Sequence, residues 1–202
     1  MNYQLELDNL IASLGDRRPK LLLHSCCGPC SSYVITYLNQ YFDITVLYFN
    51  PSIAPDEEYY HRKEVQLSLI SQYNETTENK VLFMDCDYDH QSFLDLVLGF
   101  ECEPEGGERC HICYRQRLEA TASRARDCGF EFFCSTLSVS PYKNAVVLNE
   151  IGTELSHTYE VSWLPSDFKK REGYKQSIEL SKLYNLYRQD YCGCEFSKKG
   201  NR

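Results

Sequence analysis

Most of the eleven cysteines stand in three closely spaced groups, and thiols at such spacing can hold a metal or exchange electrons. The first group ends the apolar run "KLLLHSCCGPC", the second lies in "ERCHICYRQRL", and the third lies in "DYCGCEFS". Their members are Cys26, Cys27 and Cys30, then Cys110 and Cys113, then Cys192 and Cys194. The chemistry to assign is therefore either metal ligation or thiol–disulfide exchange.

The first group contains C-G-P-C, the redox tetrapeptide of thioredoxin-like dithiol oxidoreductases, where it follows a strand and opens a helix. Cys26 directly precedes it, and a third sulfur has no use in dithiol exchange but can serve a metal. Cys110 and Cys113 share one face of an expected helix, near its start, where the helix dipole favours thiolates. We therefore predict that these five cysteines are metal ligands.

The third group flanks Gly193, and its spacing is too tight for an ordinary two-ligand zinc knuckle. Cys192 and Cys194 could form a redox pair or supply one sulfur to the site. His24 lies within an expected strand and is interpreted as a core histidine. The remaining cysteines are predicted to be buried as small hydrophobic residues. They are Cys86, Cys102, Cys128 and Cys134.

Composition limits the classes of function. The chain has 202 residues, 43% of them hydrophobic, and a net charge of −8. We expect one domain over 1–202, with a helical lead-in at 1–19 and a frayed tail at 198–202. No apolar run approaches the roughly 20 residues that cross a bilayer, and the start lacks the pattern of a signal peptide. A cytoplasmic protein with reduced thiols and no membrane contact is expected, and its acidity argues against a general polyanion binder.

Apolar runs alternate with segments of helical spacing along the whole chain. This alternation predicts an α/β fold, a single Rossmann-like domain with a mainly parallel sheet flanked by helices. The expected strands are 20–26, 42–50, 80–88, 130–137 and 158–164, and the expected helices are 31–41, 56–73, 90–100, 110–128, 141–155 and 172–187.

Ligands bind such sheets at the carboxyl ends of the strands, and we place the metal site there. The first cysteine group follows the first strand, Asn50 the second, 85–87 lie near the end of the third, and 135–137 end the fourth. Continued alternation argues against a thioredoxin fold. A tRNA-thiolating or adenylating enzyme would need a Gly-rich phosphate loop where this chain has "CCGPCSS".

The type of metal is not decided by spacing, because four thiolates can hold zinc or an iron–sulfur cluster. A structural zinc site is usually a closed, local knuckle. Here the ligands come from distant segments and meet at the edge of the sheet where ligands are expected to bind. This favours a catalytic metal centre over a non-catalytic zinc-binding module.

From Leu21 to Ser197 the chain resembles the iron–sulfur, cobalamin-independent family of epoxyqueuosine reductases. The resemblance rests on five motifs in order and at the expected separations. They are "HSCCGPC", "NPSIAPDEEYYHR", "RCHICYRQRL", "STLSVSPYKN" and "DFKKREGYKQSIELSKLYNLYRQDYCGCEFS". One departure from some members is Cys30, where they have Asp; both residues are anionic iron ligands.

The resemblance implies an oxidoreductase of tRNA queuosine biosynthesis. It would remove the epoxide oxygen of epoxyqueuosine at the anticodon wobble position, giving queuosine and water with two electrons and two protons. It also implies a [4Fe-4S] cluster beside a second metal ion, expected to be iron. The partners would be tRNA carrying epoxyqueuosine and an unidentified electron donor. The implied ligands are the same five cysteines, with their division between the two centres open.

The family motifs also supply candidates for catalysis and substrate binding. A tRNA anticodon offers bases that stack on aromatic rings and phosphates that attract Arg and Lys. The helix of the second cysteine group carries Arg109, Arg115, Arg117, Arg124 and Arg126, which we predict to provide basic charge. The catalytic candidates are Cys192, Cys194, Glu58 and Tyr114. The substrate-binding candidates are Asn50, Tyr59, Arg62, Arg117, Tyr142, Lys170, Arg171, Tyr174 and Tyr191.

Overall fold

The computed structural model describes residues 2–198 and has a five-stranded parallel sheet in the order β3-β2-β1-β4-β5. The predicted α/β class with a parallel sheet is confirmed. The strands are β1 (Lys20–His24), β2 (Asp43–Tyr48), β3 (Leu82–Asp85), β4 (Phe132–Ser135) and β5 (Ser162–Trp163).

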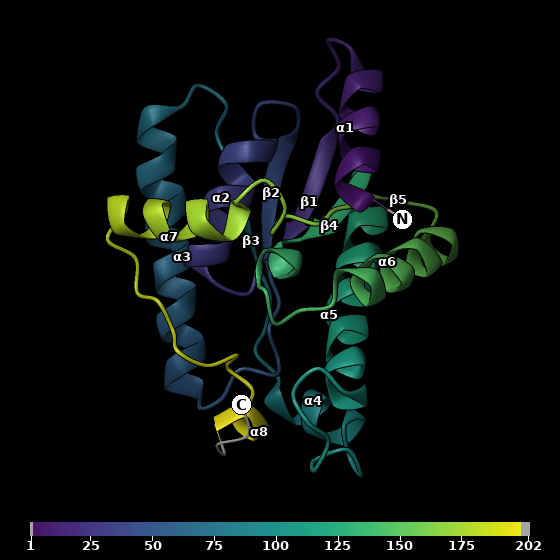
Figure 1. The fold of residues 1–202 in the computed structure, drawn as a ribbon, viewed down its shortest axis with the longest axis vertical. Coiled ribbons are helices and arrows are strands. Elements are labelled where there is room, and N and C mark those ends of the chain that lie inside the picture. Colours follow the sequence, from purple (N-terminus) through teal and green to yellow (C-terminus); the bar gives the residue numbers. More distant parts are fainter. Residues whose placement is uncertain (1, 199–202) are drawn as a thin grey trace.

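Helices connect the strands and cover both faces of the sheet (Figure 1). The helices α2 and α3 lie on one side, and α5 and α6 lie on the other. The helices are α1 (Tyr3–Leu14), α2 (Gly28–Leu38), α3 (Asp56–Thr76), α4 (His90–Leu96), α5 (Glu108–Asp127), α6 (Ala145–Tyr159), α7 (Gly173–Leu183) and α8 (Glu195–Lys198), with a 3₁₀ turn η1 (Thr136–Val139).

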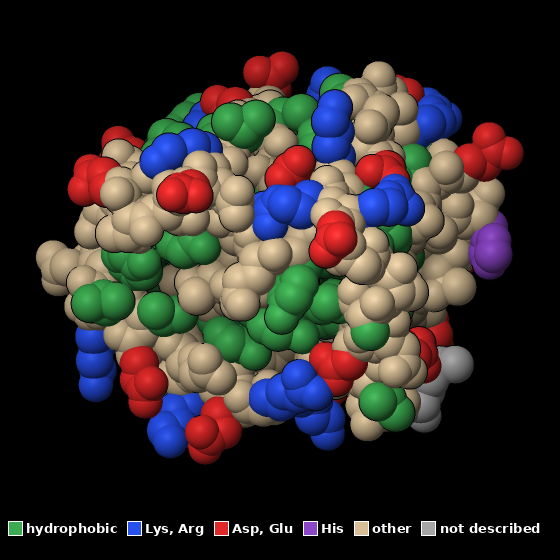
Figure 2. All heavy atoms as spheres, turned by 90° about the horizontal axis from the view of Figure 1, so that it is seen from above, with side chains coloured by type: hydrophobic (Ala, Val, Ile, Leu, Met, Phe, Trp, Pro, Cys, Tyr) green, Lys and Arg blue, Asp and Glu red, His purple; other side chains and the backbone are tan. Residues whose placement is uncertain are grey.

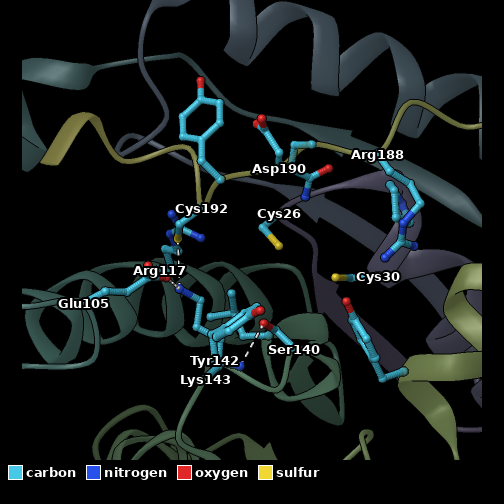
Figure 3. Close-up of a pocket in the computed structure, with 15 residues that line it drawn as sticks. Cys26, Cys30, Glu105, Arg117, Ser140, Tyr142, Lys143, Arg188, Asp190 and Cys192 are labelled. Carbon is cyan, nitrogen blue, oxygen red and sulfur yellow. Dashed lines mark hydrogen bonds and ion pairs between the residues drawn. The ribbon is translucent and has the colours of Figure 1, made fainter. Parts of the chain in front are cut away.

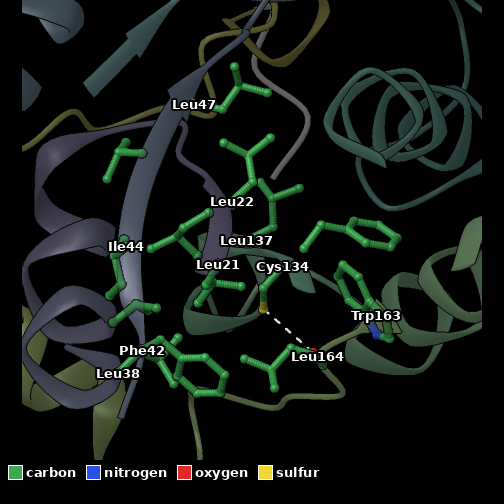
Figure 4. Packing of buried hydrophobic residues seen from close by; sticks show 14 of the residues in the cluster. Leu21, Leu22, Leu38, Phe42, Ile44, Leu47, Cys134, Leu137, Trp163 and Leu164 are labelled. Atoms are coloured by element: carbon green, nitrogen blue, oxygen red, sulfur yellow. Dashed lines mark hydrogen bonds between the residues drawn. The ribbon is translucent and has the colours of Figure 1, made fainter. Parts of the chain in front are cut away.

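The centre of the sheet is apolar because β1 is covered on both faces. Leu21, Leu22 and Leu23 have no exposed surface, as expected for a strand buried on both sides of a parallel sheet. Leu22 is in register with Thr45 on one neighbour and Phe133 on the other. Figure 4 shows Leu21 and Leu22 packed among hydrophobic side chains of neighbouring elements. The core thus fixes β1, and with it the residues that follow β1.

The strand order reverses direction at β1. The chain goes from β1 outward to β2 and β3, then returns to pair β4 with the other edge of β1. The loops after β1 and β4 therefore leave the sheet toward opposite faces, and a crevice between such loops is where ligands bind in open α/β sheets. Those loops carry the first cysteine group and residues 136–144.

Several element boundaries differ from the expected ones for local reasons. The helix α2 begins at Gly28 instead of 31, because Pro29 is accepted in the first turn, where its missing N–H costs nothing. The helix α6 begins at Ala145 instead of 141, because the Asn144 side chain caps the N–H of Val146. The last predicted strand forms only over Ser162–Trp163.

The burial predictions for isolated cysteines are partly wrong. Cys134 is buried in β4, as predicted, and Cys86 is half-buried. Cys102 and Cys128 are exposed, because each lies in or beside a polar loop next to a helix end instead of on a core-facing surface. The expected lead-in at 1–19 contains the helix α1, Lys198 of the expected tail ends α8, and residues 199–202 lie outside the described residues.

Within residues 2–198, no helix is long and apolar enough to cross a membrane. Figure 2 shows the face at the amino ends of the strands, where basic and acidic side chains lie interspersed. At this end, Arg17 pairs with Glu131 and Arg18 pairs with Asp43. Paired charges of this kind do not form a basic patch for a polyanion.

Candidate metal centre and substrate cavity

The first cysteine group forms a compact triad of thiols after β1. Cys26, Cys27 and Cys30 have sulfur atoms within 4.8 Å of one another, a spacing that could hold a metal ion. Hydrogen bonds from the thiols of Cys26 and Cys30 hold the pKa of Cys27 well below its usual value. The triad therefore favours a thiolate, which is the form that binds metal.

Buried polar residues brace the turn that carries this triad. Asn50, which follows β2, donates to the Ser25 carbonyl at 2.8 Å, and Gln66 accepts from the hydroxyls of Ser25 and Ser31 at 2.7 Å. His24 has no exposed surface, lies 2.9 Å from the Ser135 hydroxyl and 3.0 Å from the Phe49 carbonyl, and is confirmed as a core histidine. Burial lowers its pKa to about 4, so the imidazole is neutral near pH 7.

The other two cysteine groups meet at a second, inner cavity. Cys110 and Cys113 project from the first turns of α5, and Cys192 and Cys194 come from the segment before α8. All four line a cavity of about 20 Å³. Its remaining lining residues are Phe93, Arg109, Tyr114, Arg117 and Lys143. The structure thus brings together two cysteine pairs that lie far apart in the sequence.

The C-terminal pair depends on the glycine between its members. Gly193 has φ +103°, a conformation that L side chains rarely adopt. A Cβ at this position would also lie 2.9 Å from a guanidinium nitrogen of Arg62. The Gly193 carbonyl accepts a hydrogen bond from the Ala54 N–H at 2.9 Å. The C-G-C sequence is therefore required by the backbone turn as well as by the thiols.

A larger, outer cavity of about 320 Å³ opens beside the triad (Figure 3). Cys26 and Cys30 form part of its wall, and Arg117, Lys143 and Cys192 line both cavities. The outer cavity is completed by Pro29, Glu105, Leu137, Ser140, Tyr142, Tyr174, Arg188, Gln189, Asp190 and Tyr191. A substrate in this cavity would be in contact with thiols of two cysteine groups.

Two buried cations lie between the cysteine groups. Arg117 is 2% exposed and donates to the Ser52 hydroxyl, and within residues 2–198 no carboxylate forms an ion pair with it. Lys143 is 8% exposed and its Nζ lies 2.9 Å from Cys192 Sγ. Burial alone would raise the pKa of Cys192, but Lys143 and Arg117 outweigh it, and the net shift is downward. Buried cations require nearby anions, and Lys143 has one in Glu105 at 3.7 Å, with the Cys192 thiol as a second group that ionises more readily there.

Three donors on residues that line the inner cavity have no acceptor among residues 2–198. They are the Nε of Arg109, the hydroxyl of Tyr114 and the Nε of Arg117, all of them buried. Buried polar groups are almost always paired, and an unpaired one costs about 1–3 kcal/mol. Three such donors around one thiol-lined cavity indicate that an acceptor-rich group belongs there.

The predicted catalytic residues lie at different distances from the cavities. Tyr114, Cys192 and Cys194 line the inner cavity. Glu58 lines neither of them; it accepts from Arg62 Nε at 2.6 Å and from the Tyr187 hydroxyl at 3.4 Å. Glu58 therefore holds the guanidinium of Arg62, and its role in catalysis stays a prediction.

The predicted substrate-binding residues also divide into two sets. Tyr142, Tyr174 and Tyr191 line the outer cavity, and Lys170 is exposed near the start of α7. Arg171 is exposed and pairs with Asp8 of α1. Asn50, Tyr59 and Arg62 are 1% exposed, so their side chains present almost no surface to a macromolecule. All three donate hydrogen bonds to backbone carbonyls of loops, and their role in substrate binding stays a prediction.

The predicted basic charge around α5 is not available as a patch. Arg109 is 3% exposed and donates to backbone carbonyls of Glu101 and Glu103. Arg115 forms a two-point ion pair with Glu154, and Arg126 pairs with Asp127. These three arginines therefore bind their own surroundings, whereas Arg124 of the same helix is exposed.

Sequence reasoning missed four charged residues of the outer cavity: Glu105, Lys143, Arg188 and Asp190. Lys143 lies within the motif "STLSVSPYKN", and Arg188 and Asp190 lie within "LYRQDYCGC", so their positions inside family motifs were the available signal. Glu105 comes from a loop without secondary structure, and nothing local in "ECEPEGGER" indicates that it faces a cavity.

Comparison with known proteins is consistent with this site. The family model described as epoxyqueuosine reductase QueH matches residues 21–200. An epoxyqueuosine reductase QueH of Streptococcus pyogenes is 44% identical over 182 residues, covering 90% of this chain and 71% of its own length. That of Staphylococcus epidermidis is 42% identical over 201 residues (98% and 84%), and that of Thermotoga maritima is 32% identical over 183 residues (88% and 89%). The chain therefore belongs to the epoxyqueuosine reductase QueH family.

Proposed function

We propose that this chain reduces the epoxide of epoxyqueuosine in tRNA to the alkene of queuosine, in the outer cavity and with electrons from thiolate-held metal. The proposal rests on the thiols in the wall of that cavity. Cys26 and Cys30 line the outer cavity, and Cys192 lines both the outer and the inner cavity. The reduction consumes two electrons and two protons and releases the epoxide oxygen as water. The enzyme would act in the cytoplasm, where its thiols stay reduced.

We assign a [4Fe-4S] cluster to the four cysteines of the inner cavity. The supporting observation is the set of unpaired donors on Arg109, Tyr114 and Arg117, because a cluster adds inorganic sulfides that accept hydrogen bonds. A zinc ion held by the same four thiolates would add no such acceptor. The cavity volume of about 20 Å³ would suit a single ion as it stands, so a cluster requires the thiols to turn outward. Sulfide analysis separates these two occupants.

We assign the second metal ion, with iron as the expected identity, to the triad of Cys26, Cys27 and Cys30. Three ligands leave a coordination position open, and Cys26 and Cys30 face the outer cavity. When bound, the two centres would supply single electrons and a Lewis acid for the epoxide oxygen. This assignment is supported by the sulfurs of the triad, which lie within 4.8 Å of one another.

The residues of the chain would bind and orient the modified nucleoside. Tyr142 and Tyr174 line the outer cavity and are 59% and 38% exposed, so their rings are accessible to an unstacked base. Arg188, also in the outer cavity, is held by the Ser181 hydroxyl at 3.0 Å and the Ser177 carbonyl at 3.3 Å. A guanidinium held in this way can contact the phosphate or ribose next to the base.

Thioredoxin-like dithiol exchange is disfavoured by the same geometry. An exchange site needs two thiols that a partner disulfide can reach, whereas Cys27 is 1% exposed and the third thiol, that of Cys26, would have no function. A non-catalytic zinc module does not explain a cavity of about 320 Å³ against the triad.

Anaerobic purification followed by iron and acid-labile sulfide analysis tests the metal assignment, and an assay on epoxyqueuosine-containing tRNA tests the reaction. We expect brown protein with more iron than sulfide, since the triad adds iron without sulfide, and conversion of the modified tRNA with a chemical reductant. Colourless protein that carries zinc and no sulfide would refute the metal assignment. Brown protein that is inactive on this tRNA would refute the proposed reaction.

A further inference from the structure

The carboxylate of Asp8, on α1, lies where three helices meet. One of its oxygens accepts a hydrogen bond from Arg171, just before α7. The other accepts from the Tyr37 hydroxyl of α2 at 3.2 Å and from Gln4 Nε2 at 3.1 Å. The Asp8 side chain is 24% exposed, so its ion pair is partly shielded from water and salt. Asp8 precedes Leu21 and therefore lies outside the five family motifs.

The turn that Asp8 contacts has an uncommon backbone conformation. Arg171 and Glu172 have φ of 52° and 60°, a left-handed conformation that residues other than glycine seldom adopt. Gly173 follows, and a Cβ at this position would overlap the carbonyl oxygen of Phe168, so the chain passes very close to itself here. Such a turn persists where surrounding contacts hold it. The ion pair between Asp8 and Arg171 is one such contact, and it comes from a distant part of the chain.

The turn leads directly to a residue of the outer cavity. Tyr174 follows Gly173, is 38% exposed and lines that cavity. The centre of its ring lies 6.0 Å from the guanidinium carbon of Arg188, which lines the same cavity. The helix α2 packs against α7, and its first turn carries the cavity residues Pro29 and Cys30. A movement of the turn would therefore shift the Tyr174 ring relative to the opposite wall of the cavity.

We propose that Asp8 positions Tyr174 for the modified nucleoside, by holding Arg171 and with it the turn before α7. This inference rests on the proposed function, because it takes the outer cavity as the place where the base binds. Asp8 lines neither cavity, so it is a positioning residue that acts through its neighbours. Burial and the Asp8 carboxylate raise the pKa of Tyr37 to about 12, so this hydroxyl keeps its proton and stays a donor to Asp8 near pH 7.

Hydrogen–deuterium exchange of the peptide that covers residues 168–178 tests whether Asp8 holds the turn. This peptide contains the N–H of Gly173, which donates to the Lys170 carbonyl at 3.0 Å. Asp8→Asn removes the charge and keeps the shape of the side chain, and Arg171→Gln removes the charge of its partner. We expect faster exchange in either variant. The double variant should exchange no faster than the single ones, because all three lack the same ion pair.

The KM and kcat for tRNA carrying epoxyqueuosine test the consequence for the substrate. We expect Asp8→Asn to raise KM about three- to fivefold, the size of one partly exposed ion pair, with kcat near that of wild type. In a Tyr174→Ala background, Asp8→Asn should have no further effect on KM, because the residue that it positions is absent.

The matched control is Asp16→Asn, which changes an exposed residue in the turn after α1. Both Asp→Asn variants remove one negative charge from an acidic chain, so long-range electrostatics alone would lower KM for tRNA in both. The rise expected for Asp8→Asn therefore has the opposite sign to the general effect of charge. A peptide from β1 reports unfolding of the whole domain and should exchange as in wild type in every variant.

Each outcome decides the proposal. Wild-type exchange over residues 168–178 in Asp8→Asn overturns it, and so does faster exchange with an unchanged KM. A lower KM in Asp8→Asn than in Asp16→Asn also overturns it, because the freed Arg171 would then bind tRNA itself. An equal rise of KM with and without Tyr174 shows that Asp8 does not act through that ring.

Two further results separate this inference from its premises. If Asp8→Asn also speeds exchange in the β1 peptide, Arg171→Gln decides by the same exchange criterion. Wild-type protein that is inactive on this tRNA refutes the proposed function and the role of Tyr174 with it. The exchange measurement still decides in that case whether Asp8 holds the turn, because it requires no substrate.

Discussion

Arg62 of α3 donates a hydrogen bond from Nη1 to the backbone carbonyl of Cys192, at 3.1 Å and across 130 positions of the chain. Its Nη2 donates to the Tyr191 carbonyl at 3.3 Å, and its Nε donates to Glu58 at 2.6 Å. The guanidinium also lies 5.0 Å from the centre of the Tyr191 ring. One buried side chain therefore ties the C-terminal cysteine pair to the first half of the sheet without being a metal ligand.

The first prediction follows from this contact. Arg62→Met should lower the free energy of unfolding by about 3 kcal/mol, because it leaves Glu58 without its cation and two buried carbonyls without a donor. Iron content should fall as well, because Cys192 and Cys194 lose their fixed backbone. Urea unfolding of the metal-free protein measures the first effect, and iron analysis of loaded protein measures the second.

The matched control is Arg124→Met, which removes an exposed arginine of α5. It should leave stability within about 0.5 kcal/mol of wild type, as expected for a surface change. If Arg62→Met has the stability and iron content of this control, the C-terminal pair is held by other contacts.

Arg62 also shows what sequence can and cannot predict. Its motif marked it as functional and we assigned it to the substrate, whereas the structure buries it against the backbone. Strand and helix order was predictable, because apolar runs and helical spacing are local properties of the chain. The partner of a buried cation depends on which distant segment packs on it, and no local pattern contains that information.

The candidate metal site was also predictable only in part from the sequence. Adjacent thiols in Cys26, Cys27 and Cys30 indicate a ligand group, and the structure places them within 4.8 Å of one another. The meeting of Cys110 and Cys113 with Cys192 and Cys194 was left open, because it depends on the path of the chain after α7. Lys143 was missed because a single lysine in a motif carries no signal of burial.

The second prediction concerns the four cysteines of the inner cavity. Cys110→Ala, Cys113→Ala and Cys194→Ala should each lose most of the sulfide and the greater part of the iron, while far-ultraviolet circular dichroism stays that of wild type. The fold should survive because Cys113 and Cys194 belong to a small cluster apart from the core around β1, and Cys110 packs only against the edge of that core. Cys102→Ala, which removes an exposed thiol, is the control and should keep full sulfide. Full sulfide in any of the three cavity variants would remove that cysteine from the cluster.

The third prediction separates a buried cation from an exposed one. Lys170→Ala should weaken tRNA binding uniformly and reduce the salt dependence, the slope of log K against log salt, by about 1, because one phosphate contact is lost. Arg117→Met should leave that slope unchanged and lower iron and sulfide, because Arg117 is buried between the cysteine groups. Filter binding at several salt concentrations, paired with metal analysis, measures both. A smaller slope in Arg117→Met would indicate instead that Arg117 contacts a phosphate of the tRNA directly.

The fourth prediction returns to the C-G-P-C sequence. If Cys30 is a metal ligand, charge and reach matter more than sulfur, because a carboxylate can also bind iron. Cys30→Asp should therefore keep a measurable part of the activity on epoxyqueuosine-containing tRNA. Cys30→Ala should lose iron equivalent to the second metal while keeping its sulfide, since the thiols of the inner cavity are unchanged.

In a dithiol exchange site, by contrast, Asp would be as damaging as Ala, because a disulfide requires two sulfurs. Both variants are prepared anaerobically, iron and sulfide are counted per chain, and each is assayed on the modified tRNA. Cys128→Ala, an exposed thiol beyond the end of α5, shows the effect of losing a cysteine outside the site. If Cys30→Asp and Cys30→Ala lose activity equally and keep their iron, the tetrapeptide is a thiol-exchange site. In that case only the sulfur of Cys30 matters, and a carboxylate cannot replace it.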